Sequence, residues 1–115
     1  MIDLYGITNC DTVRKARRWL EAHGVDYRFH DFRKEAPSRE QIARWLQAVG
    51  NAVLVNRRGQ TWRRLPESQR NGLTPDQVPD LLLEHPTLIK RPVVELPDGR
   101  IEVGFSEARY QELFA

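Results

Sequence analysis

The chain has 115 residues, 40% of them hydrophobic, and its formal net charge is +2, from 18 basic and 16 acidic residues. This length suits one domain, expected over 1–115, with a core large enough to fold without disulfides or a structural metal. The single cysteine excludes an internal disulfide and a cysteine-rich zinc site, and the balanced charge does not favour a nucleic-acid partner.

The apolar segments of the sequence bear on location. No basic region precedes an apolar stretch long enough for a signal peptide, and no segment has the length of a membrane span. A lone cysteine also suits a reducing compartment. We therefore expect a cytoplasmic protein that does not use a membrane as a partner.

The N-terminal part of the chain predicts a strand, a helix and a second strand. An apolar run at 2–5 is typical of a buried strand, and apolar residues then recur at helical spacing from Cys10 to about His23, where Gly24 ends the helix. Alternating apolar and polar residues predict the second strand over 25–32. Two strands separated by a helix of this length form a parallel pair.

The middle of the sequence is helical. Ser38 and Gln41 form a capping-box pattern that begins a helix, and Gly50 ends that helix. A short helix is expected at 60–64. A second capping pattern at 74–77 begins a helix that ends at His85 and Pro86.

The C-terminal part predicts a hairpin and a final helix. Two β-rich runs, 88–96 and 100–104, are joined by Pro97-Asp98-Gly99, which is a strong turn signal between antiparallel strands. Ser106 is expected to cap the last helix. The complete order predicts an α/β fold with a four-stranded mixed sheet.

The only cysteine stands where the first helix begins, which is where chemistry is expected. The first turn of a helix has unpaired backbone N–H groups and a partial positive charge, and Arg14 lies one turn further on the same face as Cys10. A sulfur placed there is easier to ionise, and the same field can hold an anionic substrate. The alternative is a small buried hydrophobic cysteine. The polar neighbours Asn9, Asp11 and Thr12 argue against it.

Basic residues cluster at three places in the chain. The clusters are Arg14, Lys15, Arg17 and Arg18; Arg57, Arg58, Arg63 and Arg64; and Lys90 with Arg91. A solvated charged face is the simplest interpretation of any such cluster. We assign Arg17 and Arg18 to a solvated face because they do not share the helix face of Cys10.

Three segments together resemble the ArsC/Spx/YffB family of thioredoxin-fold proteins. They are Tyr5–Thr12, His85–Val93 and Asn56–Gly59. The first and third are most similar to the YffB branch, whose members are thought to be glutathione-dependent thiol reductases, and the second is shared with arsenate reductases. The resemblance spans essentially the whole chain. It implies a single ArsC-like domain with a thioredoxin-like fold and a helical insertion at about 37–85.

The resemblance assigns roles to several residues. It implies that Cys10 is the nucleophile, assisted by Arg14, that Pro92 is a cis proline beside it, and that Arg91 holds an oxyanion. A further family arginine falls at Arg57 or Arg58, where the alignment is ambiguous by one residue and Arg58 is preferred. The predicted substrate-binding set is therefore Asn9, Thr12, Arg57, Arg58, Arg91 and Pro92. Taken alone, Pro92 could equally be a trans proline at the start of a strand.

Two departures from the family pattern limit the chemistry. Redox-switch members have a Cys-x-x-Cys at the helix start, whereas Val13 occupies the second position here, so Cys10 needs an outside thiol to resolve it. Arsenate reductases have a Gly-Arg-Pro-type segment where this chain has Gly104-Phe105-Ser106. Losing a charged ligand of this kind costs about 1.5–3 kcal/mol, which argues against efficient arsenate reduction.

These observations favour a glutathione-dependent thiol reductase with one nucleophilic cysteine. Glutathione or another small thiol is the expected co-substrate, glutaredoxin is a further candidate partner, and the protein is expected to be a monomer. We expect no permanently bound cofactor and no metal, because His23, His30 and His85 are not spaced as a metal site. The alternatives are a glutathione- or glutaredoxin-coupled arsenate reductase and a non-catalytic, Spx-like module that regulates transcription.

Overall fold

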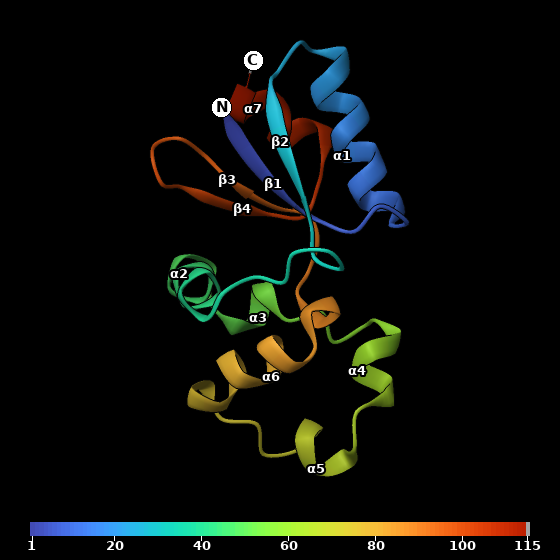
Figure 1. The fold of residues 1–115 in the computed structure, drawn as a ribbon, viewed down its shortest axis with the longest axis vertical. Coiled ribbons are helices and arrows are strands. Elements are labelled where there is room, and N and C mark those ends of the chain that lie inside the picture. The colour runs from blue at the N-terminus through green and yellow to red at the C-terminus, as the bar shows by residue number, and fades with distance from the viewer. Residues whose placement is uncertain (115) are drawn as a thin grey trace. The chain divides into compact units, whose positions relative to one another are not determined.

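The N-terminal residues form the parallel strand–helix–strand unit that the sequence predicts. In the computed structural model, which describes residues 1–114, β1 (Ile2–Gly6) leads through α1 (Asp11–Ala22) to β2 (Tyr27–Asp31), and β1 pairs with β2 in parallel (Figure 1). The second strand is shorter than expected. The N–H of Val25 donates to the carbonyl of Leu20 at 2.9 Å, so this residue closes the turn that follows α1 and does not join the sheet.

A hairpin completes a four-stranded mixed sheet. Strands β3 (Val93–Glu95) and β4 (Ile101–Val103) are antiparallel, β3 is also antiparallel to β1, and the strand order is β2-β1-β3-β4. Helix α7 (Glu107–Phe114) follows, and the N–H of Arg109 donates to the Ser106 hydroxyl at 3.1 Å. The sequence prediction of the sheet and of the Ser106 cap is confirmed.

The strand predicted over 88–96 is wrong in its first half. A short 3-10 helix covers Pro86–Leu88, and Ile89 forms an isolated antiparallel bridge with Val55. Two backbone bonds of 2.7 Å, from Asn56 to Leu88 and from Lys90 to Leu54, flank this bridge. The β-forming segment is therefore paired elsewhere, and Pro92, which has no N–H, separates it from β3.

The chain divides into two units, and the core of the first lies on one face of the sheet. Unit 1 contains Met1–Glu35 and the C-terminal segment from Arg91, and unit 2 is Ala36–Lys90. Even-numbered residues of β1 and β3 and odd-numbered residues of β2 face this core, because successive side chains of a strand alternate between faces and Ile2 and Leu4 pair with Tyr27 and Phe29. The buried cluster consists of Ile2, Leu4, Val13, Ala16, Trp19, Leu20, Val94, Leu96 and Tyr110. The expected single domain over 1–115 stays a prediction.

The other face of β1 and β2 has a polar cluster beside an aromatic stack. The Tyr5 and His30 rings stack with centroids 4.5 Å apart, and Nε2 of His30 lies 2.8 Å from a carboxylate oxygen of Asp3. Arg28 donates to the same carboxylate at 3.0 Å. Partial burial alone raises the pKa of Asp3, but the hydrogen bonds and charges of His30 and Arg28 outweigh it and hold that pKa below its ordinary value.

Gly6 is needed because α1 approaches β1 very closely at this position. A Cβ atom added to Gly6 would lie 2.7 Å from Cγ2 of Val13, which is fully buried. No ordinary carbon contact is that short, and a packed interior has little space into which Val13 could move. The glycine thus lets the helix that begins after Cys10 pack directly on the end of β1.

Unit 2 is helical. Its elements are α2 (Arg39–Val49), α3 (Asn51–Leu54), α4 (Gln60–Arg64), α5 (Glu67–Arg70), a 3-10 turn (Pro75–Gln77), α6 (Val78–Glu84) and the 3-10 turn before Ile89. The predicted capping box is present, since Ser38 accepts from the Gln41 N–H at 3.1 Å and the Gln41 side chain accepts from Ser38 at 2.9 Å. Fully buried Ile42 and Trp45 of α2 provide the centre of this unit.

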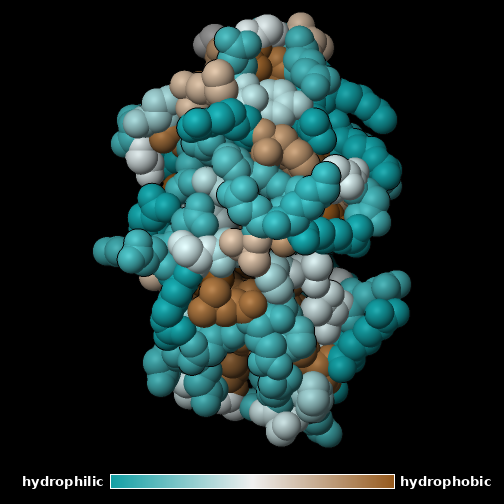
Figure 2. Space-filling view, viewed as in Figure 1, coloured by the Kyte–Doolittle hydropathy of each residue, from teal (hydrophilic) through white to brown (hydrophobic). Residues whose placement is uncertain are grey.

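Within residues 1–114, no helix combines the length and the apolar character needed to cross a bilayer. The face drawn in Figure 2 is mostly hydrophilic, and its apolar side chains are exposed as separate patches. Isolated patches of this kind are normal for protein surfaces.

We predict that Gly6→Ala lowers the free energy of unfolding by about 1–3 kcal/mol, because the new methyl group overpacks the Val13 contact. Denaturant unfolding of Gly6→Ala, Val13→Ala and the double variant measures this. If the clash is the cause, the double variant is no less stable than Val13→Ala alone. Additive losses would show that the glycine is needed for another reason.

We predict that Asp3→Asn is destabilising at neutral pH and that its difference from wild type disappears in acid. The folded-state pKa of Asp3 is depressed, so its stabilisation is complete above the unfolded-state value of 3.8 and is lost as the pH falls below it. Urea midpoints at neutral, mildly acidic and strongly acidic pH measure the effect. Asp26→Asn is the control, and an equal pH-dependent loss in that variant would contradict the assignment.

Candidate active site

Four chain segments meet at one end of the sheet in unit 1. Strand β1 ends at Gly6, and the chain continues from there to Cys10. Tyr5 pairs with Val93, so the residues that precede β3 lie at the same end, and Val93 pairs with Val103 at the end of β4. Parallel β2 also ends there. Such an end, where several loops converge, is the usual place for a site in an open α/β sheet.

Cys10 is the residue at the N-cap of α1. Its backbone is extended (φ −117°, ψ 124°), its carbonyl accepts from the Arg14 N–H at 2.9 Å, and its side chain makes no capping hydrogen bond. The side chain is half-buried and packs against the edge of the unit 1 core. The sulfur therefore stands before the unpaired N–H groups of the first turn and is neither sealed in the core nor fully exposed.

Arg14 has a partner that the sequence analysis did not assign. Its guanidinium donates to the Asp11 carboxylate at 2.9 Å, and both side chains are exposed. The i,i+3 spacing of the two residues could have revealed the pair. An exposed pair of this kind is weak, at about 0–1 kcal/mol, so an anionic substrate can compete for Arg14.

The other predicted residues near the cysteine occupy its loop and its helix. Asn9 is exposed in the loop before Cys10, and Thr12 is half-buried in the first turn of α1. Thr12 also lines a groove between α1 and the segment that leads into α7. Asn9 directly precedes Cys10, and Thr12 is two residues after it. Contact of either side chain with a substrate stays a prediction.

Arg91 and Pro92 enter β3 at this end of the sheet. The Arg91–Pro92 peptide bond is cis, as the family resemblance implied, and the Pro92 carbonyl accepts from the Gly104 N–H at 2.8 Å. Arg91 is half-buried, and no residue of the described chain forms an ion pair with it. Its charge is therefore available to an anion.

Arg57 and Arg58 belong to unit 2. The Arg57 guanidinium lies over the Trp62 ring, 5.5 Å from its centroid, in a cation–π contact. The Arg58 N–H donates to the Asn56 side chain at 3.1 Å, which forms the predicted polar turn, and the Arg58 side chain is exposed. The part of either arginine in substrate binding stays a prediction.

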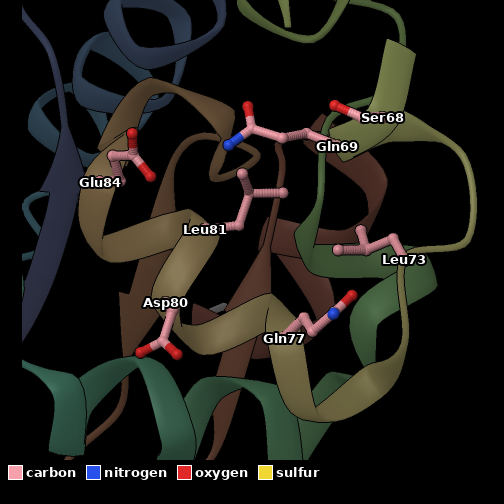
Figure 3. Close-up of a pocket in the computed structure, with 7 residues that line it drawn as sticks. All are labelled: Ser68, Gln69, Leu73, Gln77, Asp80, Leu81 and Glu84. Carbon is pink, nitrogen blue, oxygen red and sulfur yellow. The ribbon is translucent and has the colours of Figure 1, made fainter. Parts of the chain in front are cut away.

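A pocket in unit 2 contains none of the predicted site residues. It has a volume of about 270 Å³, and Figure 3 shows the Gln69 amide pointing over Leu81 toward Glu84, with Asp80 on the same helix. The two carboxylates that line this pocket, Asp80 and Glu84, lie on consecutive turns of α6. Asp80 is paired with Arg39. Residues 1–114 contain no group of three or more His, Cys, Asp or Glu side chains placed to hold a metal.

Comparisons with known proteins place the chain in a family. The ArsC family matches residues 5–113. An uncharacterised Haemophilus influenzae protein is 44% identical over 115 residues, covering 100% of both chains, and the global transcriptional regulator Spx of Lactiplantibacillus plantarum is 30% identical over 109 residues, covering 93% of this chain and 81% of Spx.

Solved structures show the same similarity. The YffB protein is 43% identical and covers 100% of both chains with a TM-score of 0.95. A Brucella melitensis protein related to arsenate reductase is 46% identical, covers 98% of this chain and 93% of its own, and has a TM-score of 0.78. The arsenate reductase of Vibrio cholerae, 22% identical with a TM-score of 0.82, covers 98% of this chain and 97% of its own and shows the fold alone.

The sheet order, the cysteine at the start of α1 and the cis proline before β3 define an α/β protein with a thioredoxin-like fold. With a match over nearly its entire length, the chain belongs to the ArsC family. The similarity to YffB agrees with the branch that the sequence motifs indicated.

We predict that Cys10 reacts preferentially with anionic reagents and that Arg14 and Asp11 tune this preference in opposite directions. Anionic iodoacetate and neutral iodoacetamide both alkylate the thiolate. The rate with iodoacetate divided by the rate with iodoacetamide therefore reports attraction of the anion rather than ionisation of the thiol. Arg14→Gln should lower this ratio about two- to fivefold, and Asp11→Asn should raise it to a similar extent.

Added salt is the control, because screening must shrink both effects. Ratios that do not change in either variant would show that Arg14 does not act on an anion at Cys10.

Proposed function

We propose that this protein is an oxidoreductase, specifically a glutathione-dependent thiol reductase that uses Cys10 alone. The observation that supports it best is the position of the only cysteine, half-exposed before the first turn of α1, at the sheet end where Arg91 and Pro92 enter β3. A thiol buried for packing would not need this placement.

The reaction proceeds by two thiol–disulfide exchanges. The Cys10 thiolate attacks the glutathionyl sulfur of a mixed disulfide, R–S–S–G, forming Cys10–S–S–G and releasing R–S⁻, which takes up a proton. The thiolate of a second glutathione then attacks the glutathionyl sulfur, releasing the Cys10 thiolate and glutathione disulfide. One disulfide is reduced and one is formed, so the two electrons come from glutathione.

The surrounding groups bind the glutathione moiety. Arg14 and Arg91 supply positive charge for its carboxylates, and Arg58, or Arg57 in its place, is a further candidate. The backbone at Arg91 suits pairing with an extended peptide, because neither its N–H nor its carbonyl has a backbone partner within residues 1–114. The Pro92 carbonyl, by contrast, already accepts from Gly104.

Arsenate reduction with the same residues is the second candidate. Its support is the 46% identity to the Brucella melitensis protein related to arsenate reductase. Against it stands the segment Gly104-Phe105-Ser106, which has no arginine to complete an oxyanion site. We therefore expect arsenate to be reduced inefficiently.

A non-catalytic role like that of Spx is the third candidate. The 30% identity to a regulator named Spx supports it. The absence of a second cysteine does not prevent binding to a partner, but it removes an internal redox switch. Val13, which occupies that position, is fully buried against Gly6 and has a packing role instead.

The remaining features of the proposal concern partners and location. Glutathione, or another small thiol, acts as co-substrate without a permanently bound cofactor or metal, and glutaredoxin is a further candidate for regenerating Cys10. The protein works as a cytoplasmic monomer and uses neither nucleic acid nor a membrane as a partner.

We predict that glutathione disulfide adds one glutathionyl group to wild-type protein and none to Cys10→Ser, as measured by intact-protein mass spectrometry. Reduced glutathione should then remove the adduct, because the second exchange needs no protein thiol. Arg91→Gln should slow adduct formation about three- to tenfold, whereas Arg91→Lys should retain part of the rate.

Two results would separate the candidates. No adduct on Cys10 would remove the reductase proposal and favour the binding module. Faster turnover with arsenate than with a glutathione mixed disulfide would favour arsenate reduction.

A further inference from the structure

In addition to the candidate site at Cys10, unit 1 has a groove of about 730 Å³ between α1 and the start of α7. It is lined from Thr12, in the first turn after Cys10, to His23 at the end of α1. Trp19 and Phe105, which line it, belong to or pack against the same core cluster as Cys10. The groove therefore starts at Thr12, two residues after the candidate nucleophile.

The positive charges that line this groove are unpaired. Lys15 and Arg18 are exposed, and neither forms an ion pair with any residue in the described part of the chain. Like charges three residues apart on a helix repel one another, and an anion bound between them removes that repulsion. Glu107 is the one carboxylate in the lining, on the opposite wall, so an anionic group is favoured on the α1 side.

The neighbouring cations of α1 have partners of their own. Arg14 is paired with Asp11. Arg17, which the sequence analysis assigned to a solvated face, instead lies 4.2 Å from the centroid of the Phe29 ring and donates to the Tyr27 hydroxyl at 3.0 Å. Of the four cations in this stretch, the two without a partner are the two that line the groove.

The length of the groove indicates the kind of occupant. From Thr12 to His23 the helix rises about 16 Å, which matches roughly five residues of extended peptide. Glutathione, a tripeptide, spans only about 10 Å and would leave the far part empty. The aromatic side chains of Trp19 and Phe105 suit an apolar side chain between acidic ones.

We propose that this groove binds an extended acidic segment, with an apolar residue in it, next to the glutathionylated cysteine of a protein substrate. The inference rests on the proposed reductase function and names its substrate class. Binding along α1 brings the mixed disulfide to Cys10, because the groove begins at Thr12, two residues after Cys10, and runs along the helix from there. Lys15 and Arg18 act as specificity-determining residues and take no part in the exchange.

Two blocked peptides test this, Glu-Phe-Glu-Gly-Cys and its neutral counterpart Gln-Phe-Gln-Gly-Cys, each carrying glutathione in disulfide linkage on the cysteine. Each is also made in the reverse order, because the groove does not fix the direction of the chain. We expect wild-type kcat/KM with excess glutathione to be about three- to tenfold higher for the acidic peptide in at least one direction.

The Lys15→Gln/Arg18→Gln variant should lose this preference while retaining its rate on the neutral peptide. Arg63→Gln/Arg64→Gln, which removes the same charge from α4, is the matched control and should keep the preference. Equal rates for the two peptides in wild type would overturn the proposal, and so would a preference that survives in the Lys15/Arg18 variant.

A binding measurement separates failure of the groove from failure of the reductase. Cys10→Ser protein is titrated with the same peptides bearing serine in place of cysteine, and backbone amide shifts are followed by NMR. If wild type reduces neither disulfide, the reductase proposal fails, yet shifts along α1 with the acidic peptide only still support the groove. Glutathione that shifts the Lys15 and Arg18 amides at lower concentration than the peptide would overturn the peptide assignment.

Discussion

The packing of α1 on the end of β1 is the constraint on which the site depends. Gly6 has no side chain, so Val13 can sit directly against the strand, and the helix then begins one short loop after the strand ends. This contact fixes where the Cys10 sulfur stands relative to the start of β3. A bulkier residue at Gly6 would push the helix start away from the strand end. The position of Cys10 is therefore a consequence of core packing rather than of polar contacts.

The cations of α1 differ in whether they have partners within the described chain. Arg17 covers the edge strand β2 through Phe29 and Tyr27, and Arg14 is held by Asp11. Lys15 and Arg18 have no such partners. A single basic cluster in the sequence thus contains side chains with different physical roles. Weak surface pairs such as Arg14 with Asp11 can be exchanged for a bound anion, whereas the packed Arg17 cannot be moved without exposing aromatic surface.

The segment that departs from the arsenate reductase pattern has its own structural role. In place of an arginine, Phe105 packs edge-on against Tyr110, with ring centroids 4.7 Å apart, and Ser106 caps α7. Both residues also line the groove beside α1. The two residues that follow Gly104 therefore have packing, capping and groove-lining roles in this chain. An apolar ring in place of a cation supports the proposed peptide disulfide substrate over a small oxyanion.

The sequence by itself determined the N-terminal strand–helix–strand unit, the C-terminal hairpin and helix, the capping residues Ser38 and Ser106, and the placement of Cys10 at a helix start. These features depend on periodicity and on contacts between residues close in the chain. Only the tertiary structure decided that residues 88–90 pair with 54–56 rather than extend β3, that Arg17 packs on Phe29, and that Lys15, Arg18 and Phe105 share a groove. Each of these depends on contacts between segments distant in the chain, and local residue patterns do not encode which distant surface a side chain meets.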